Sequence, residues 1–424
     1  MGETLPFRIL LASLQRQCFD NKVSTSGLKL NEIYAKNEIY TARMKLSRHF
    51  ELIALLAIAG CIRAPITSIG PQINAISESQ NLGIVQFGFL TAIPVICFAL
   101  AAPLPSLRVF RKIKTEQLIV FALLALATAT VFRTLRSNSL LFGATIVLGI
   151  SIAILNIVTP ALVRRDYPKK ITTVMPIYSA VLALMASLGS GLSIPIASYF
   201  GNNWKVGISV WAIPAVLVAL TWIPLLRRAK PMPDAHENHF KELLRSKKAW
   251  LVSLYMGFQS ATFYTQVAWM PKILIDKGYS AAEAGALFGL TSLCGFALTL
   301  ILPLVFSRGE DLKLAILATS VPGIFGFLLL NHLSSSWTIP ALLMISTTHA
   351  ALPLALGLIA MKSPSQGATS HLSSMAQGIG YCVAAAFPVL IGYTYEVSNS
   401  WLVATYLISF LILMQSIVGI RANR

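Results

Sequence analysis

Arg63 is the residue whose position most strongly points to chemistry. It lies inside the apolar run Leu52–Ile69, where its side chain cannot easily reach water. An arginine at the centre of a bilayer costs about 2.5–3.5 kcal/mol on insertion scales, and such residues usually face a cavity within the protein. No aspartate or glutamate lies in the hydrophobic part of any predicted span, so the simplest partner is an anionic or strongly polar ligand. The alternative is capping by backbone carbonyls or extension towards the interface.

Pro65 follows two residues after this charge. A proline interrupts a helix, and irregular backbone at membrane depth has to line a cavity or be buried in protein. Interrupted helices beside a charge are typical of transport sites. Arg63 and Pro65 together therefore predict a substrate site in the first spanning helix.

A polar stripe is predicted on one face of the seventh apolar helix. Gln259, Thr262 and Gln266 are spaced i, i+3, i+7, which places them on the same face. Tyr264 adds a polar-tipped aromatic ring, and we expect Gln259 and Tyr264 to hydrogen-bond a substrate. Trp269 also has a polar-tipped ring, but an aromatic belt at the membrane interface explains it at least as well as a contact with substrate.

Two further helices carry polar residues that would be costly in lipid. Asn156 precedes Pro160 by four residues, and it either hydrogen-bonds a neighbouring helix or contacts substrate. Ser373, Gln377 and Tyr381 follow one another at four-residue steps, so this stripe either lines the cavity or joins helices. We include Asn156, Gln377 and Tyr381 in the predicted substrate site.

Two titratable side chains are candidates for moving protons. His349 can change its charge near neutral pH and relay a proton, and the alternative is a hydrogen-bonded structural histidine. Glu51, at the cytoplasmic end of the first helix, could serve instead.

The composition is that of a polytopic membrane protein. Of the 424 residues, 55% are hydrophobic and only 12% are charged. Apolar runs of spanning length predict an all-α membrane protein with twelve transmembrane helices. These runs lie near residues 50–69, 85–107, 117–134, 139–163, 173–197, 205–226, 250–271, 284–306, 313–331, 338–361, 369–392 and 401–420.

The distribution of basic residues predicts the orientation. The N-terminal tail and the loops on its side hold 28 of the 34 Lys and Arg residues, and the opposite loops hold 5. Both termini are therefore expected in the cytoplasm. The net charge of +18 is split among many short loops, which does not fit a nucleic-acid-binding stripe.

The chain is predicted to contain two six-helix pseudo-repeats, at 48–228 and 250–424, joined by a cytoplasmic linker at 229–249. Residues 1–47 form a polar tail that we expect to be disordered. Met44 would make an ordinary start for the membrane part, so the residues before it are either tail or an over-extended reading frame. The repeat rests on identical residues 197 positions apart, namely Gly88 and Gly285, Cys97 and Cys294, Asn202 and Asn399, and Trp204 and Trp401.

Enzyme signatures are missing from the sequence. There is no phosphate-binding Gly-Lys-Ser/Thr loop. No arrangement of Ser, His and Asp typical of a catalytic triad stands out, and neither does a cluster of metal ligands. The five cysteines lie in spans or in the tail, and none is paired in an exposed loop. We therefore expect no enzyme, no metal site and no cofactor.

Four segments carry a family resemblance. They are Arg63–Pro71; Phe142-Gly143 through Leu155-Asn156, Pro160 and Arg164–Pro168; Gln259-Ser260, Phe263-Tyr264, Trp269–Pro271, Gly278–Ser280 and Ala284-Gly285; and Ser374–Tyr381 with Pro388. They resemble the cyanate and 2-nitroimidazole transporter family (CynX/NimT-like) of the major facilitator superfamily. The resemblance runs from about residue 50 to the C-terminus. It implies the major facilitator fold, in which helices 1, 4, 7 and 10 line a central cavity.

One loop departs from the superfamily's usual pattern. Between helices 2 and 3 the superfamily usually carries Gly, Asp-Arg and Gly-Arg-Lys, whereas here Pro103–Lys112 keeps basic residues and lacks the aspartate. Asp166, between helices 4 and 5, would then pair with Arg108 or Arg111 as a cytoplasmic gate. The alternative is a solvated loop that follows the positive-inside rule.

These observations together predict a secondary active transporter. We expect it to move a small anion or polar heterocycle, cyanate-like or nitroimidazole-like, across the bacterial inner membrane by alternating access. Its partners would be that substrate, the lipid bilayer and protons as the coupling ion, and the protein would be a monomer. The alternatives are a drug or metabolite efflux transporter and, in a different class, a transporter-like membrane sensor.

Overall fold

The structure is a computed structural model that describes residues 50–104, 113–135, 137–228, 240–306, 311–363 and 366–424. The predicted tail at 1–47 lies outside the described residues, as do 229–239 of the predicted linker. The residues from Ala54 to Arg424 form one compact unit.

Helices account for the regular structure of the described residues. The first span covers Phe50–Thr67 and ends with the short helix α3 (Ala64–Thr67). The helices that follow in the first half are α4 (Ile73–Gln80), α5 (Ile84–Ala101), α7 (Thr115–Phe132), α8 (Asn138–Asp166), α9 (Ile171–Tyr199), α10 (Trp204–Ser209) and α11 (Ala212–Trp222). The second half contains α12 (Phe240–Arg245), α13 (Lys247–Asp276), α14 (Ala281–Phe306), α15 (Lys313–His332), α16 (Thr338–Ser346), the 3₁₀ segment η5 (Thr347–Ala350), α17 (Ala351–Met361), α18 (Gln366–Ser398) and α19 (Trp401–Asn423).

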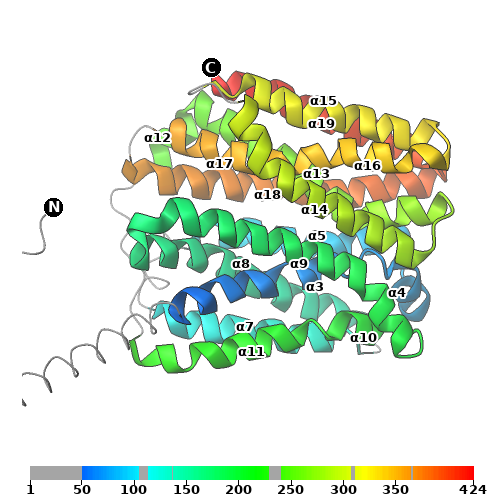
Figure 1. Ribbon diagram of the computed structural model, residues 1–424, viewed down its shortest axis with the longest axis horizontal. Helices are drawn as coiled ribbons and strands as arrows, with labels where there is room; N and C mark the ends of the chain where they lie inside the picture. The colour runs from blue at the N-terminus through cyan, green and yellow to red at the C-terminus, as the bar shows by residue number, and fades with distance from the viewer. Residues whose placement is uncertain (1–49, 105–112, 136, 229–239, 307–310, 364–365) are drawn as a thin grey trace, which may run out of the picture. The chain divides into compact units, whose positions relative to one another are not determined.

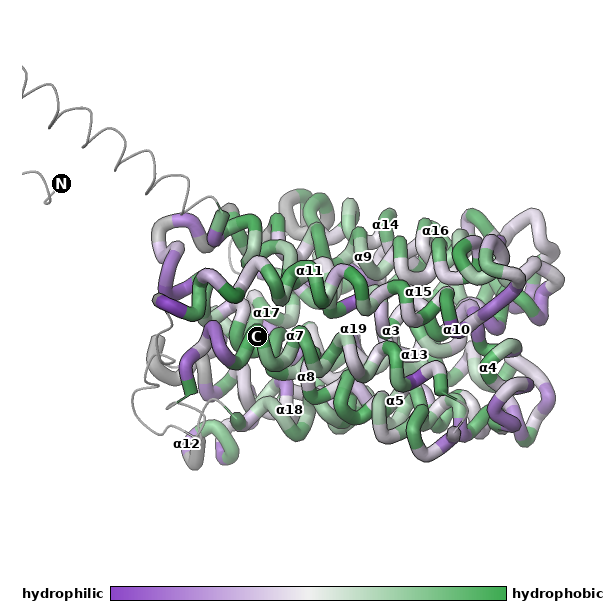
Figure 2. Tube along the Cα trace, turned by 90° about the horizontal axis from the view of Figure 1, so that it is seen from below, coloured by the Kyte–Doolittle hydropathy of each residue, from purple (hydrophilic) through white to green (hydrophobic). Residues whose placement is uncertain are grey.

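Eleven helical stretches among the described residues are long and apolar enough to cross a membrane. Figure 2 shows that hydrophilic residues gather at the two ends of the helices and hydrophobic ones lie between them. Helices are suited to the interior of a bilayer because each backbone donor finds its acceptor within the same segment.

One predicted span is not among these eleven. It is the seventh in chain order, and it corresponds to α13, which has 30 residues. It is less apolar than the others because its middle carries polar side chains. Most of its residues between Ala249 and Leu274 are buried within the protein, so α13 does not need a lipid-facing surface. Counted with α13, the described helices make the all-α, twelve-span architecture that the sequence predicts.

The two halves of the chain form two groups of helices that lie side by side (Figure 1). They meet where α5 packs against α18 and where α9 packs against α14. A glycine of the predicted repeat permits each contact: a Cβ at Gly88 would lie 2.9 Å from the Pro388 carbonyl oxygen, and one at Gly285 would lie 2.7 Å from that of Ser190. Small residues let membrane helices approach closely, so these two glycines make equivalent contacts in the two halves.

The turns also follow the 197-residue offset. Asn202 and Asn399 have φ values of 58° and 48°, and each lies just before a spanning helix. Asn81 and Gly278 are separated by the same offset and have φ values of 50° and 103°. Asparagine and glycine are the residues that visit this left-handed region routinely, so matching residues give matching turns.

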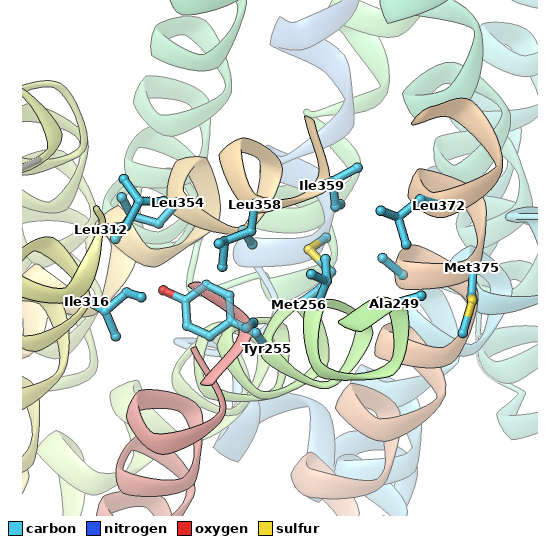
Figure 3. Close-up of a cluster of buried hydrophobic side chains, with 14 of the residues drawn as sticks. Ala249, Tyr255, Met256, Leu312, Ile316, Leu354, Leu358, Ile359, Leu372 and Met375 are labelled. Carbon is cyan, nitrogen blue, oxygen red and sulfur yellow. The ribbon is translucent and has the colours of Figure 1, made fainter. Parts of the chain in front are cut away.

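Apolar packing holds the second half together around a cluster of buried side chains (Figure 3). Tyr255 and Met256 of α13 contribute to this cluster with Ile316 of α15, Leu358 of α17 and Met375 of α18. Between membrane helices such packing gains mainly from van der Waals contact. The cluster therefore fixes the position of α13, the helix that carries the polar stripe.

Candidate functional site

A cavity of about 150 Å³ lies between the two groups of helices. Its wall combines residues of the first span and α9 with residues of α13, α14, α18 and the interrupted helix over Ser335–Met361. None of the described lining residues is an aspartate or glutamate. They are Arg63, Ser179, Leu182, Ala183, Ala186, Gln259, Ser260, Phe263, Tyr264, Ser292, Phe296, Thr299, Thr348, His349, Leu352, Pro353, Leu356 and Tyr381.

Arg63 reaches this cavity and contacts two residues of α13. Its Nη1 donates a hydrogen bond to the hydroxyl of Tyr264 over 3.1 Å. Its guanidinium carbon lies 5.3 Å from the centroid of the Phe263 ring, which is a cation–π contact. The cation therefore joins the first half of the chain to the second.

The first span breaks where Arg63 lies. Residues 50–62 are helical, and α3 starts again with Pro65 in its first turn. The N–H groups of Ile66 and Thr67 both donate to the Arg63 carbonyl, at 3.0 and 3.1 Å. The break turns the arginine towards the cavity instead of leaving it on a continuous helix face.

Arg133, at the end of α7, holds this break in place. Its Nη1 donates to the Pro65 carbonyl oxygen over 2.9 Å, and the residue is only 2% exposed. Burial without a charged partner in the described part of the chain lowers the pKa of Arg133 to about 10, so it stays a cation at neutral pH. Arg133 is one of the five basic residues that the sequence assigned to the loops opposite the N-terminal side, whereas the structure places it inside the protein.

Aromatic rings surround the Arg63–Tyr264 pair. Phe98 of α5 lies with its ring centroid 6.1 Å from Tyr264 and 5.5 Å from Tyr381 of α18, and the two tyrosine rings are 6.4 Å apart. Such edge-to-face and tilted arrangements are favourable for aromatic pairs. Tyr381, predicted as a substrate ligand, thus lies beside Tyr264 in the cavity wall.

His349 lies in the same cavity at a second helix break. It belongs to η5, which interrupts the helix between α16 and α17. Its ring makes an edge contact with Phe263 at 5.5 Å between centroids, and its Nε2 is buried without a described hydrogen-bond partner. Gly295 of α14 leaves room for the imidazole, since any Cβ there would collide with the ring. Arg63 and His349 therefore contact the same phenylalanine, Arg63 over its ring and His349 in an edge contact.

The polar stripe of α13 divides into two roles. Gln259 lines the cavity. Thr262 donates to Gln415 over 3.4 Å, and Gln266 donates to Thr348 over 3.0 Å. These two bonds tie α13 to α19 and η5, so only part of the predicted stripe faces a ligand.

Two predicted substrate ligands lie away from the cavity lining. Gln377 donates to Ser373 over 2.9 Å within α18. Asn156 is partly exposed on α8 and does not appear in the described lining. Trp269 is wholly buried and donates to the Pro388 carbonyl over 2.8 Å, so the interpretation of Trp269 as part of an interfacial belt is wrong.

The predicted cytoplasmic gate is described only in part. Arg108 and Arg111 lie outside the described residues. Asp166 pairs with its neighbour Arg165 at 2.8 Å, and Arg165 also pairs with Glu116 of α7 at 2.6 Å. This network joins the ends of α7 and α8. Glu51 lies in the first turn of the helix over residues 50–62.

Sequence reasoning missed several lining residues. Phe296, Ser292 and Thr348 are ordinary helix residues in sequence, without a charge or a motif to mark them. Phe263 was marked only as the neighbour of the predicted ligand Tyr264 in one segment of the family resemblance. Phe263 contacts both Arg63 and His349, which makes it central to the site.

Comparison with known families assigns this architecture. The sequence model of the Major Facilitator Superfamily matches residues 55–388. The chain belongs to the major facilitator superfamily. It is therefore a multi-pass membrane transporter, and its relatives give no indication of an enzyme.

Three bacterial relatives share most of the length of this transporter. The 2-nitroimidazole transporter of Escherichia coli (strain K12) is 31% identical over 378 residues, which is 88% of this chain and 95% of that protein. The uncharacterized transporter YycB of Bacillus subtilis (strain 168) is 29% identical over 90% of this chain and 95% of its own. The cyanate transport protein CynX of Escherichia coli (strain K12) is 25% identical over 83% and 91%. The predicted family resemblance is thus confirmed.

Solved structures support the same fold. A bacterial homologue of the human lysosomal transporter Spinster, in an inward-facing and unoccupied conformation, superposes with a TM-score of 0.69 at 18% identity, covering 89% of this chain and 97% of that one. A D-xylose–proton symporter gives a TM-score of 0.65 at 15% identity, covering 88% and 96%. At these identities the similarity concerns the fold alone.

Proposed function

We propose that this transporter carries a small anion or polar heterocycle, cyanate-like or nitroimidazole-like, across the bacterial inner membrane by alternating access. The observation that carries the proposal is the Arg63 guanidinium in a cavity whose described lining has no acidic residue. A buried cation without a counter-charge favours an anionic or strongly polar ligand. The names of two relatives, a 2-nitroimidazole transporter and a cyanate transport protein, fall in that chemical range.

The position of Arg63 suggests how binding drives the cycle. Arg63 belongs to the first half, while Tyr264 and Phe263 belong to α13 of the second. A substrate that takes up the free donors of Arg63 and the Tyr264 hydroxyl contacts both halves at once. Rocking of the halves around such a midpoint is the movement expected for this fold.

Several further residues have assigned roles in this proposal. Gln259 and Tyr381 would hydrogen-bond the substrate from the cavity wall, while Asn156 and Gln377 would act only if other states of the cycle turn them inward. The gate of Arg108 and Arg111 with Asp166 would close the cytoplasmic side.

Proton coupling is assigned to His349, with Glu51 as the second candidate. His349 contacts Phe263, which in turn contacts Arg63. Protonation of the imidazole would place a second positive charge near the guanidinium and strengthen the binding of an anion. Coupling would then be substrate–proton symport, since both species occupy the site together.

The proposal includes the arrangement of the chain. Both termini and the linker at 229–249 would be cytoplasmic, the two six-helix halves would be 48–228 and 250–424, and the protein would act as a monomer.

Transport into proteoliposomes tests the proposed function. Purified protein should take up a labelled small anion or polar heterocycle, with cyanate and 2-nitroimidazole as the first probes, faster when the outside is acidic, and Arg63→Gln should reduce the uptake strongly. His349→Gln should retain exchange but lose the response to the pH gradient. Absence of uptake and exchange for every anion tried, in protein that is folded and correctly inserted, would contradict the proposal.

A further inference from the structure

We infer that the substrate is a flat, ring-bearing organic monoanion whose charge sits on a planar two-oxygen group, that is, an aromatic or heteroaromatic monocarboxylate. This inference rests on the proposed function, because it concerns the same cavity. The names of two relatives include both a triatomic anion, cyanate, and a ring compound, 2-nitroimidazole. The cavity favours a ring that carries a negative charge.

The first argument concerns the geometry of the cation. A guanidinium has five N–H donors in one plane, and among the described residues only Tyr264 accepts one of them. Two parallel N–H groups of such a fork match the two coplanar oxygens of a carboxylate. Linear cyanate has its polar atoms at opposite ends and cannot engage both donors in this way.

The second argument concerns charge. The described lining of the cavity has no carboxylate to balance Arg63, and Phe263 offers the cation only the face of its ring. Hydrogen bonds to an ionised acceptor are about twice as strong as those to a neutral one. A carboxylate therefore satisfies this site better than an uncharged nitro group, and one cation calls for one negative charge.

The third argument concerns the rest of the cavity. A volume of about 150 Å³ is far more than a triatomic anion fills, and an apolar cavity of that size is known to hold benzene. Apolar side chains supply much of the wall beyond the cation, among them Leu182, Phe296, Leu352 and Leu356. Aromatic faces and edges favour a flat ring over a puckered one of equal size.

The fourth argument concerns unused polar atoms. Ser292 Oγ and His349 Nε2 both belong to lining residues, and both are buried without a described hydrogen-bond partner. A buried polar atom without a partner is costly. A heteroatom on the ring of the ligand would pair with one of them, which favours a heteroaromatic carboxylate.

Binding to the purified full-length protein tests the inference. The probes are benzoate, pyridine-3-carboxylate, cyclohexanecarboxylate, 2-nitroimidazole and cyanate, measured by displacement of labelled benzoate at one pH and ionic strength. We expect benzoate and pyridine-3-carboxylate to bind at least about tenfold more tightly than the other three, and Arg63→Gln should weaken the binding of both by at least about tenfold. Phe296→Leu should weaken benzoate more than cyclohexanecarboxylate, whereas Phe410→Leu, on an exposed face of α19, should change neither.

Cyanate binding as tightly as benzoate, with both dependent on Arg63, would overturn the ring requirement and leave an anion transporter standing. Equal affinity for 2-nitroimidazole and benzoate would overturn the requirement for charge. Indifference of every probe to Arg63→Gln would remove the proposed function itself. Folding of each variant is checked by its thermal unfolding without ligand, so that loss of binding is not mistaken for loss of structure.

Discussion

The first span and α13 occupy matching places in the 197-residue repeat, yet only the first is broken. Arg63 is matched by Ser260, which lies 197 residues later in the middle of α13. At Arg63 the helix stops and restarts. At Ser260 it continues without interruption from Lys247 to Asp276.

This difference shows how two similar helices divide the work of a binding site. The broken helix supplies the charge and exposes backbone groups, which is tolerated only where protein replaces the lost partners. Arg133 supplies one such partner to the Pro65 carbonyl. The continuous helix supplies a rigid wall on which Phe263 and Tyr264 meet the charge.

Removing the charge from the broken helix should have the largest effect. Arg63→Gln loses charge-assisted bonds worth about 1.5–3 kcal/mol, so substrate affinity should fall by roughly 10- to 150-fold. Arg63→Lys keeps the charge but loses the planar fork, and should lose about tenfold. Equilibrium binding and proteoliposome uptake, normalised to protein abundance, measure both. Wild-type affinity and rate in Arg63→Gln would show that the arginine is structural.

Removing the support of the break should have the next largest effect. Arg133→Gln cannot place a cationic donor on the Pro65 carbonyl, so we expect a loss of about 1.5–3 kcal/mol in stability and weaker transport. Thermal unfolding in detergent and uptake assays report the two effects. Lys205→Gln removes another basic residue near the same ends of the helices and should change neither stability nor transport. A stable, fully active Arg133→Gln variant would show that the helix break at Arg63 does not need the hydrogen bond from Arg133.

Changing the wall on α13 should have a smaller effect. Tyr264→Phe keeps the ring and deletes the hydroxyl that accepts from Arg63. The loss of one hydrogen bond, about 1 kcal/mol, should weaken binding roughly fivefold. Tyr393→Phe, on an exposed face of α18, is the matched control. An effect as large as that of Arg63→Gln would show that the wall, and not the charge, dominates binding.

The matching turns should give the smallest effect and test the repeat itself. Asn202→Ala and Asn399→Ala keep the Cβ but remove the side-chain amide that makes asparagine several-fold more frequent in the left-handed region, a loss of roughly 0.5–1 kcal/mol each. Asn202→Gly and Asn399→Gly should be close to neutral, because glycine adopts this conformation freely. Thermal unfolding of the four variants makes the comparison. Unequal losses at the two sites would show that the halves are not equivalent in stability.

Much of the fold follows from the sequence because a bilayer leaves few choices. Twenty apolar residues in succession have to form a helix, and the described helices coincide with the predicted runs. The offset of 197 residues already paired Gly88 with Gly285, and the structure puts both at contacts between the halves. Arg63 was identifiable for the same reason, since a lone charge in lipid has to be explained.

Only the tertiary structure decided which polar residues share a cavity with Arg63. Gln259, Gln377 and Asn156 are alike in sequence, but only Gln259 appears in the described lining. Periodicity fixes which residues share a helix face, and the rotation and depth of that helix among its neighbours fix what the face meets. Phe263 has no polar group to mark it, yet it contacts both Arg63 and His349. Sequence could not show this, because Arg63 and its partner Tyr264 are 201 residues apart and no local pattern encodes the packing between their helices.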